Sequence, residues 1–167
     1  MTVIKSKKIK GWYRAKHSLD HSFFVERRIK MKKKLFIICS KRFYEKIPPI
    51  LKELEKRFII TLPNCYDAPD TEFRFKEMGR EEHAKFKSDM IRHSEKVIKE
   101  IDMVLVLNFD KGEYKNYIGG CTFLEMYDAF RHNKTIYIYN DIPEGILKDE
   151  IIGFNPVIIN GDLEEIK

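Results

Sequence analysis

Short apolar runs recur along the chain and alternate with longer segments whose apolar residues follow the helical period. Runs that are apolar at successive positions, rather than at every second one, are typical of strands buried on both faces. Such runs occupy residues 34–39, 58–62, 103–108, 135–139 and 157–159. The pattern predicts about five strands, each covered by helices on both sides.

The segments between these runs carry helical signals. After the first run, Pro48 and Pro49 mark the start of a helix or a break in it, and apolar residues follow at helical spacing. Further helices are predicted over about 80–100 and 121–132, with a short helix or turn over 143–153. Residues 63–75 are rich in Pro, Asn and Asp, so we interpret them as a polar loop long enough to have a function.

This order of elements predicts the fold class. Strands that alternate with helices imply right-handed crossovers and a parallel sheet. The sequence therefore predicts one three-layer α/β domain of the flavodoxin-like or Rossmann-like class over residues 34–167. Its sheet is expected to have about five parallel strands flanked by helices.

Charge is unevenly distributed, and this changes how the net charge of +6 is interpreted. Residues 1–34 contain 12 Lys and Arg against two acidic residues, whereas the remainder contains 20 Lys and Arg against 24 Asp and Glu. We interpret residues 1–33 as a flexible basic extension of the domain. The alternative is an arm that contacts nucleic acid through residues 1–34, so a nucleic-acid partner is expected only there.

The cysteine count and the hydropathy pattern bear on the compartment. Three cysteines, Cys39, Cys65 and Cys121, form no close pair and show no metal-ligand spacing. We therefore expect reduced thiols, no metal site and no cofactor. No stretch is apolar over a length that would span a membrane, and no signal-peptide core is visible. The expectation is a cytoplasmic protein without a membrane partner.

Polar residues follow the predicted strands at the points where ligands bind in this class of fold. Ser40 follows the first strand, Asn64 and Asp67 follow the second, and Asn108 and Asp110 follow the third. The carboxyl ends of parallel strands and the starts of the following helices share one edge of the sheet. These five residues are therefore candidates for substrate binding.

The segment after the third strand carries the strongest candidate. Gly119 and Gly120 precede a helix, and glycines at that place let backbone N–H groups approach a ligand closely. Thr122 and Glu125 follow in the first turns. Glu125 is the candidate catalytic carboxylate, and the other three are candidates for substrate binding.

Two more polar residues are candidates for a catalytic role. The long helix over 80–100 runs antiparallel to the strand that follows it, so its first half reaches the same edge of the sheet. Asp89 and His93 lie there at i, i+4 spacing and are candidates for the second acidic or polar function. Asp102 opens the third strand at the opposite edge, and we expect a capping or turn role for it.

These residues carry a resemblance to a known family. The strand Asp102-Met-Val-Leu-Val-Leu-Asn108, followed by Gly119-Gly120-Cys-Thr122-Phe-Leu-Glu125 with Ala129, resembles the nucleoside 2-deoxyribosyltransferase superfamily, which includes deoxynucleoside monophosphate N-glycosidases. The strand Lys134-Thr135-Ile136-Tyr137 and the C-terminal segment 155–163 fit as well. The resemblance covers about residues 33–167.

The resemblance implies a function. It assigns Glu125 the role of a nucleophile that attacks the anomeric carbon, in a transfer of 2-deoxyribose between bases or in hydrolysis of the N-glycosidic bond. The substrate would be a nucleoside or a nucleotide, and family members commonly form homo-oligomers. Aromatic residues of the 63–75 segment, Tyr66, Phe73 and Phe75, are candidates for stacking on the base.

Three positions differ from the family pattern and support a second hypothesis. Family members usually carry an acidic residue where this chain has Gly119, an aspartate where it has Ser94, and a glycine where it has Tyr127. The alternative hypothesis is therefore a module of the same fold that binds or senses a nucleotide without catalysis.

Overall fold

The computed structural model describes residues 32–167, and its five strands form one parallel sheet. The strands are β1 (Lys34–Cys39), β2 (Ile59–Thr61), β3 (Met103–Leu107), β4 (Thr135–Ile138) and β5 (Val157–Ile158). Their order in the sheet is β2-β1-β3-β4-β5, and each neighbouring pair is parallel. This is the strand order of flavodoxin-like folds, so the predicted fold class is confirmed.

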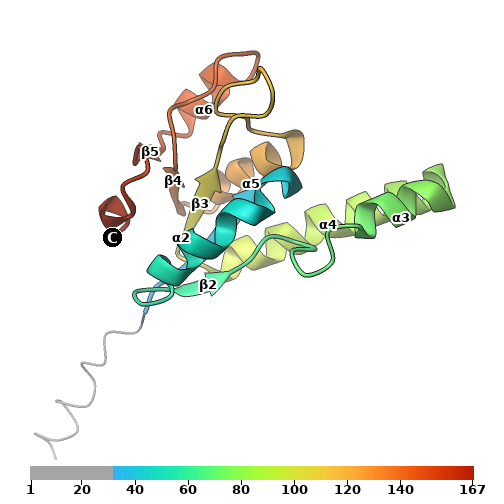
Figure 1. The fold of residues 1–167 in the computed structure, drawn as a ribbon, viewed down its shortest axis with the longest axis horizontal. Coiled ribbons are helices and arrows are strands. Elements are labelled where there is room, and N and C mark those ends of the chain that lie inside the picture. Colours follow the sequence, from blue (N-terminus) through green and yellow to red (C-terminus); the bar gives the residue numbers. More distant parts are fainter. Residues whose placement is uncertain (1–31) are drawn as a thin grey trace, which may run out of the picture. The chain divides into compact units, whose positions relative to one another are not determined.

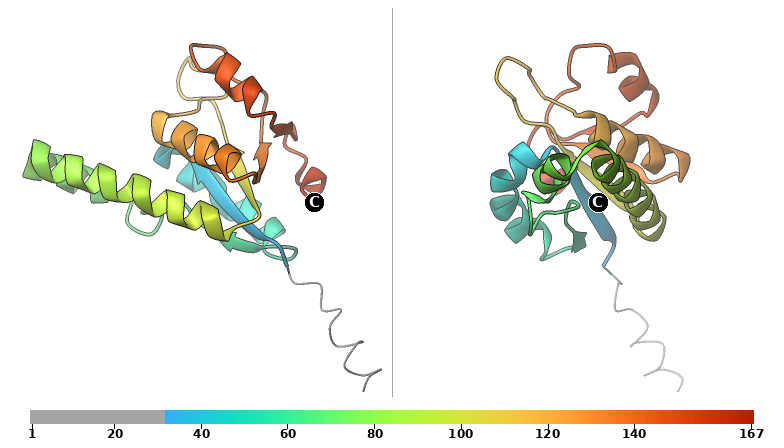
Figure 2. Two further views of the ribbon diagram at one scale, coloured as in Figure 1. Left: turned by 180° about the vertical axis from the view of Figure 1, so that it is seen from behind. Right: turned by 90° about the vertical axis from the view of Figure 1, so that its right-hand side faces the viewer.

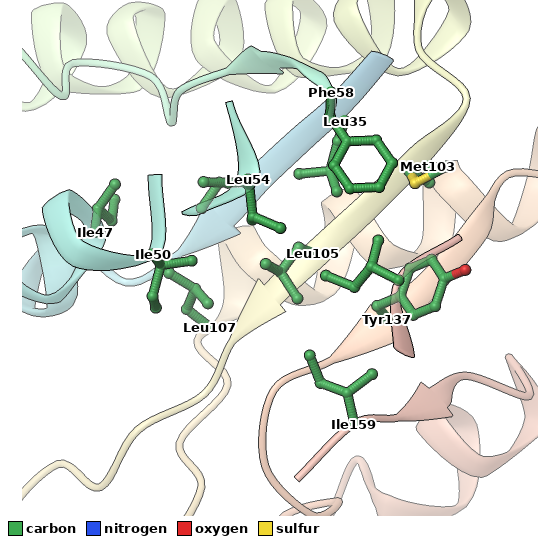
Figure 3. Close-up of a cluster of buried hydrophobic side chains, with 12 residues drawn as sticks. Leu35, Ile47, Ile50, Leu54, Phe58, Met103, Leu105, Leu107, Tyr137 and Ile159 are labelled. Atoms are coloured by element: carbon green, nitrogen blue, oxygen red, sulfur yellow. The ribbon is translucent and has the colours of Figure 1, made fainter. Parts of the chain in front are cut away.

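The two central strands are apolar throughout because both of their faces are covered. Leu35, Ile37, Met103 and Leu105 point to one face, where they pack with residues of α2 (Ile47–Leu54) and the C-terminal segment. Figure 3 shows this cluster, with Tyr137 and Ile159 extending it toward β4 and β5. Alternating residues of the same strands form the core of the opposite face, as the twofold period of a strand requires.

Helices on both faces complete the three layers. The helix α2 covers the first face, and α4 (Arg80–Glu100) and α5 (Gly120–Arg131) cover the second (Figures 1 and 2). The remaining elements are the 3-10 helices η1 (Lys41–Lys46) and η2 (Leu163–Glu165) and the helices α3 (Thr71–Met78) and α6 (Lys148–Gly153). Pro48 and Pro49 stand in the first turn of α2, where a missing N–H costs nothing.

Most predicted elements are confirmed, and one is corrected. The bounds of β1 and α4 agree with those predicted, and the other strands agree to within two residues. The 63–75 segment was predicted as a loop, but α3 begins within it at Thr71. None of the α3 residues is buried, so the sequence of this helix shows no apolar stripe by which it could be recognised.

The remaining predictions concern Asp102, the basic extension and membrane-spanning segments. Asp102 lies at the edge of the sheet opposite the carboxyl ends of the strands, where its Oδ2 accepts a 2.7 Å hydrogen bond from the backbone N–H of Lys34. The predictions about the basic extension concern residues 1–33, of which residues 1–31 lie outside the described range. Within residues 32–167, no helix has both the length and the apolar character needed to cross a membrane.

Candidate functional site

A cleft of about 410 Å³ opens at the carboxyl edge of the sheet, beside the end of β1 and the start of α5. From β1 the chain crosses to β2 on one side of it, and after β2 it crosses back to β3 on the other side. The direction in which strands are added to the sheet therefore reverses between β1 and β3. Open α/β sheets bind ligands at such a reversal. The volume lies within the range of roughly 300–1,000 Å³ that is usual for small-molecule sites.

Several separate segments line the cleft. They are the end of β1 with η1, the turn after β2, the facing sides of α3 and α4, and the segment from Lys111 to the second turn of α5. Six titratable groups stand among the lining residues beside the cations: Glu72, Glu125, Cys39, Cys121, Tyr44 and Tyr117. Glu125 is one of the lining residues of the cleft and also borders a small cavity between α4 and α5.

A line of hydrogen bonds connects Glu125 to the turn after β2. The Ser94 hydroxyl donates to Oε1 of Glu125 at 2.7 Å, and Nδ2 of Asn64 donates to Oγ of Ser94 at 2.7 Å. The Tyr44 hydroxyl donates to the backbone carbonyl of Asn64, also at 2.7 Å. Residues from α4, the turn after β2 and η1 therefore fix the position of this carboxylate.

The surroundings of Glu125 change its acidity. Burial disfavours the charged carboxylate and raises its pKa to about 7, although the Ser94 hydrogen bond and the charge of Lys87 act in the opposite direction. Nearby Cys39 is affected as well, because burial and the charge of Glu125 raise the pKa of its thiol to about 12. Near neutral pH, Glu125 thus exchanges between acid and carboxylate while Cys39 stays protonated.

A second polar cluster forms the wall made by α3 and α4. Oε1 of Glu72 lies 3.6 Å from Nζ of Lys87, 3.7 Å from Nζ of Lys76 and 3.6 Å from Nε2 of His83. Burial raises the pKa of Glu72, but these neighbours outweigh it and lower the pKa overall. Lys87 also donates to Sγ of Cys121 at 3.0 Å, which brings a cation to the start of α5.

Positive charge dominates the lining of the cleft. Lys41, Arg42, Lys76, Lys87 and Lys111 line it, against the two carboxylates Glu72 and Glu125. Lys41 and Arg42 are exposed and form no ion pair with any residue of the 32–167 range. A cleft with this excess of cations attracts an anionic ligand.

The start of α5 presents backbone donors to the same cleft. Gly119 is the N-cap residue, its backbone is extended at φ −84°, and no side chain caps the first turn. A Cβ atom at Gly120 would meet nothing within 4 Å, so the space above this residue is open. Thr122 is buried at 3% exposure and lines the cleft beside these N–H groups. Uncapped N–H groups of this kind bind anions.

The structure brings six of the predicted residues together at the cleft. They are Ser40, Asn64, Gly119, Gly120, Thr122 and Glu125. Three other predicted binding residues lie elsewhere. Asp67 is exposed, Asn108 holds the backbone of Asn140 and Asp141, and Asp110 pairs with Lys115 at 2.6 Å. Asn108 is fully buried, so it serves to tie the loops after β3 and β4 together.

The predicted pair on α4 also lies outside the cleft. Asp89 and His93 are both exposed. The residues that follow them, Met90 and Ser94, face α5 and Glu125 instead. Because successive residues on a helix are rotated by roughly 100°, Asp89 and His93 point away from the site when Met90 and Ser94 point into it.

Ser94 is the main residue that the sequence analysis did not predict to contribute to the site. It was noted only as a difference from the family pattern. The sequence does contain a signal for it, because Met90, Ser94 and Ile98 follow one another at i, i+4 spacing and so lie on one face of the helix. Ile98 on this face is fully buried. A serine in the middle of such a stripe indicates a buried hydroxyl that needs a partner.

The aromatic residues proposed to stack on a base make contacts elsewhere. Tyr66 packs against Tyr44 with ring centroids 5.3 Å apart, and Phe75 stacks on Phe86 at 4.6 Å. Phe73 is 57% exposed. The aromatic residues that line the cleft are Tyr44 and Tyr117, and Nζ of Lys111 lies 3.9 Å from the centroid of the Tyr117 ring.

Neither a metal site within residues 32–167 nor a match to a known family was found. Within the described residues, no three His, Cys, Asp or Glu side chains gather as a metal site would require. No protein-family model matches the sequence, and the search of curated proteins found no match either.

Proposed function

We propose that this protein cleaves the N-glycosidic bond of a nucleoside or nucleotide, or transfers its 2-deoxyribosyl group, with Glu125 as the nucleophile. The observation that carries the proposal is the partly buried carboxylate of Glu125. One oxygen of this group is hydrogen-bonded to Ser94, and the group lies at a cleft of a size that fits a small ligand. The resemblance of segment 102–129 to the nucleoside 2-deoxyribosyltransferase superfamily supports the same reaction class.

The reaction requires Glu125 as a carboxylate. One of its oxygens attacks the anomeric carbon and forms a glycosyl ester, while the bond between that carbon and the base nitrogen breaks. The electron pair of the broken bond leaves with the base, which takes up a proton from water. Water, or a second base, then attacks the anomeric carbon, releases the carboxylate and loses a proton, which neutralises the hydroxide formed in the first step. A carboxyl pKa of about 7 means that activity should rise as the pH increases through neutrality.

The charge of the cleft favours a phosphorylated substrate over a neutral one. The lining cations and the uncapped start of α5 are complementary to a phosphate group, which accepts hydrogen bonds from N–H donors and is attracted to lysine and arginine. We therefore propose deoxynucleoside monophosphates as the first substrates to test.

Release of free base tests the proposal directly. Deoxynucleosides and their 5′-monophosphates are incubated with the wild-type chain and with Glu125→Gln, and the bases are separated by chromatography. The expected result is base release by the wild type and a loss of at least about 10³-fold in Glu125→Gln, because the amide cannot form the ester. Turnover retained in this variant would rule out the mechanism.

A second candidate function is nucleotide binding without catalysis. It is favoured by Gly119, which stands where family members carry an acidic residue and thus leaves the cleft with fewer carboxylates. A rise in melting temperature with a monophosphate, together with no base release from any substrate, would favour this function.

A further inference from the structure

The hydrogen bonds around Ser94 have a defined direction. Nδ2 of Asn64 lies 2.7 Å from Oγ of Ser94 and 3.5 Å from the carbonyl oxygen of Met90. A carbonyl oxygen only accepts, so the NH₂ side of the Asn64 amide must face both groups. Oγ of Ser94 is therefore an acceptor toward Asn64, and its single hydrogen is left for another partner.

That partner is Glu125. Oγ of Ser94 lies 2.7 Å from Oε1 of Glu125, and the Ser94 side chain is only 4% exposed. A hydroxyl buried to this degree does not exchange its hydrogen bond freely with bulk water. The Ser94 hydroxyl therefore donates to Oε1, and Asn64 keeps it in that orientation.

The second carboxylate oxygen is in a different situation. No hydrogen bond joins Oε2 of Glu125 to any residue of the 32–167 range. An oxygen that accepts a strong hydrogen bond has lower nucleophilicity, whereas an oxygen without one keeps its electron pairs available. The two oxygens of Glu125 thus differ in what they can do.

We infer that Ser94, held by Asn64, anchors one oxygen of Glu125 and leaves the other free to attack the anomeric carbon. Ser94 is then a positioning residue, because it acts through Glu125 and not on the substrate. This inference rests on the proposed function of Glu125 as a nucleophile. It also explains how a serine serves at a position where the resemblance implied an aspartate.

Other titratable groups around Glu125 affect how the test is interpreted. Lys87 faces it from α4, Asp128 from its own helix, Cys39 from the end of β1 and Tyr44 from η1. These groups are unchanged in a Ser94 variant, so a shift in the titration of Glu125 is attributable to the lost hydrogen bond. A donor to a carboxylate lowers its pKa, and removing the donor must raise it.

The test compares Ser94→Ala with Ser94→Thr in the full chain, and uses Ser88→Ala as the matched control. Ser88 lies on the same helix but contacts Arg92 instead of Glu125. In Ser94→Ala we expect kcat to fall about 10–100-fold with KM changed less than about twofold, since a hydrogen bond to a charged group is lost. The acid limb of the kcat profile should move to higher pH. Threonine keeps the hydroxyl and should restore most of the activity, and Ser88→Ala should behave as wild type.

A second readout does not depend on turnover. The carboxyl carbon of Glu125 is titrated by ¹³C NMR and assigned by its absence in Glu125→Gln. Ser94→Ala should raise the pKa of Glu125 by about one unit, and Ser88→Ala should leave it unchanged. If Ser94→Ala does not fold, Ser94→Cys keeps nearly the same volume with a weak donor and should show the same upward shift.

The outcomes separate the two proposals. An unchanged titration in Ser94→Ala or Ser94→Cys, or a variant that changes KM and leaves kcat intact, would overturn the positioning role. A shifted titration without base release by the wild type would confirm the hydrogen bond, reject the proposed function and, with it, reject a positioning role in that reaction.

Discussion

Glu125 lies in surroundings that favour its neutral form, so folding and proton binding are linked at this residue. Its pKa is about 7 in the folded chain, whereas an unfolded glutamate has a pKa of about 4.3. Between these two values the folded state binds more protons than the unfolded state. The free energy of unfolding therefore decreases as the pH rises from about 4.3 to 7, and the contribution of Glu125 is lost above that range.

Glu125→Gln should abolish the decrease in the free energy of unfolding that the wild type shows as the pH rises from about 4.3 to 7. Glutamine is neutral at every pH and keeps an oxygen that accepts from Ser94. The variant is therefore expected to match the wild type near pH 4.5 and to be more stable at pH 8, by at most about 4 kcal/mol. Urea unfolding followed by circular dichroism at several pH values measures the difference.

Asp89→Asn is the matched control for this comparison, because Asp89 is exposed and lies outside the cleft. It should reproduce the pH dependence of the wild type. A Glu125→Gln curve parallel to the wild-type curve between pH 4.5 and 8 would contradict the burial of a titrating carboxylate at this position.

At the scale of whole elements, the two edges of the sheet have different roles. The cleft lies at the carboxyl edge, while Asp102 joins β1 to the start of β3 at the opposite edge through its 2.7 Å hydrogen bond from Lys34. Asp102→Ala should lower the free energy of unfolding by about 1 kcal/mol, because solvent exposure weakens this hydrogen bond to a charged group. Base release should be unchanged.

The measurement pairs urea unfolding with the base-release assay in one preparation of Asp102→Ala. A large drop in turnover with stability close to wild type would show that the opposite edge takes part in the reaction. That result would contradict the division between a functional edge and a structural edge.

The elements also show what the sequence could predict. β1 and β3 are continuous buried apolar runs, and α4 carries buried or half-buried apolar residues at helical spacing, so the bounds of these elements followed from the sequence pattern. α3 buries no residue and carries no such signal, so a helix was not predicted there. Glu125 was predicted because it follows glycines and a buried strand. The hydrogen bond between Glu125 and Ser94 was not predicted, because it depends on how α4 packs against α5. The local sequence pattern does not encode that packing.

At the scale of the whole molecule, the distribution of charge matters more than its sum. Residues 35–167 contain 20 Lys and Arg against 24 Asp and Glu, so this part of the chain is slightly acidic. The cleft nevertheless has five cations against two carboxylates. The concentration of positive charge at one site in an acidic domain indicates a local role in binding an anion, and not a general affinity for polyanions.

Binding of a deoxynucleoside monophosphate should therefore weaken with salt. Between 50 and 300 mM NaCl we expect its Kd to rise about 3–10-fold, because salt screens the attraction between the phosphate and exposed cations. The matching deoxynucleoside has no charge, and its Kd should stay constant.

Arg42→Ala should weaken binding of the monophosphate by a similar factor, whereas Lys52→Ala, on the exposed side of α2, should not. Calorimetric titration of 2′-deoxyadenosine and its 5′-monophosphate measures all four cases. Equal salt dependence for both compounds would show that the cations of the cleft do not bind the phosphate, because only the monophosphate carries a charge to be screened.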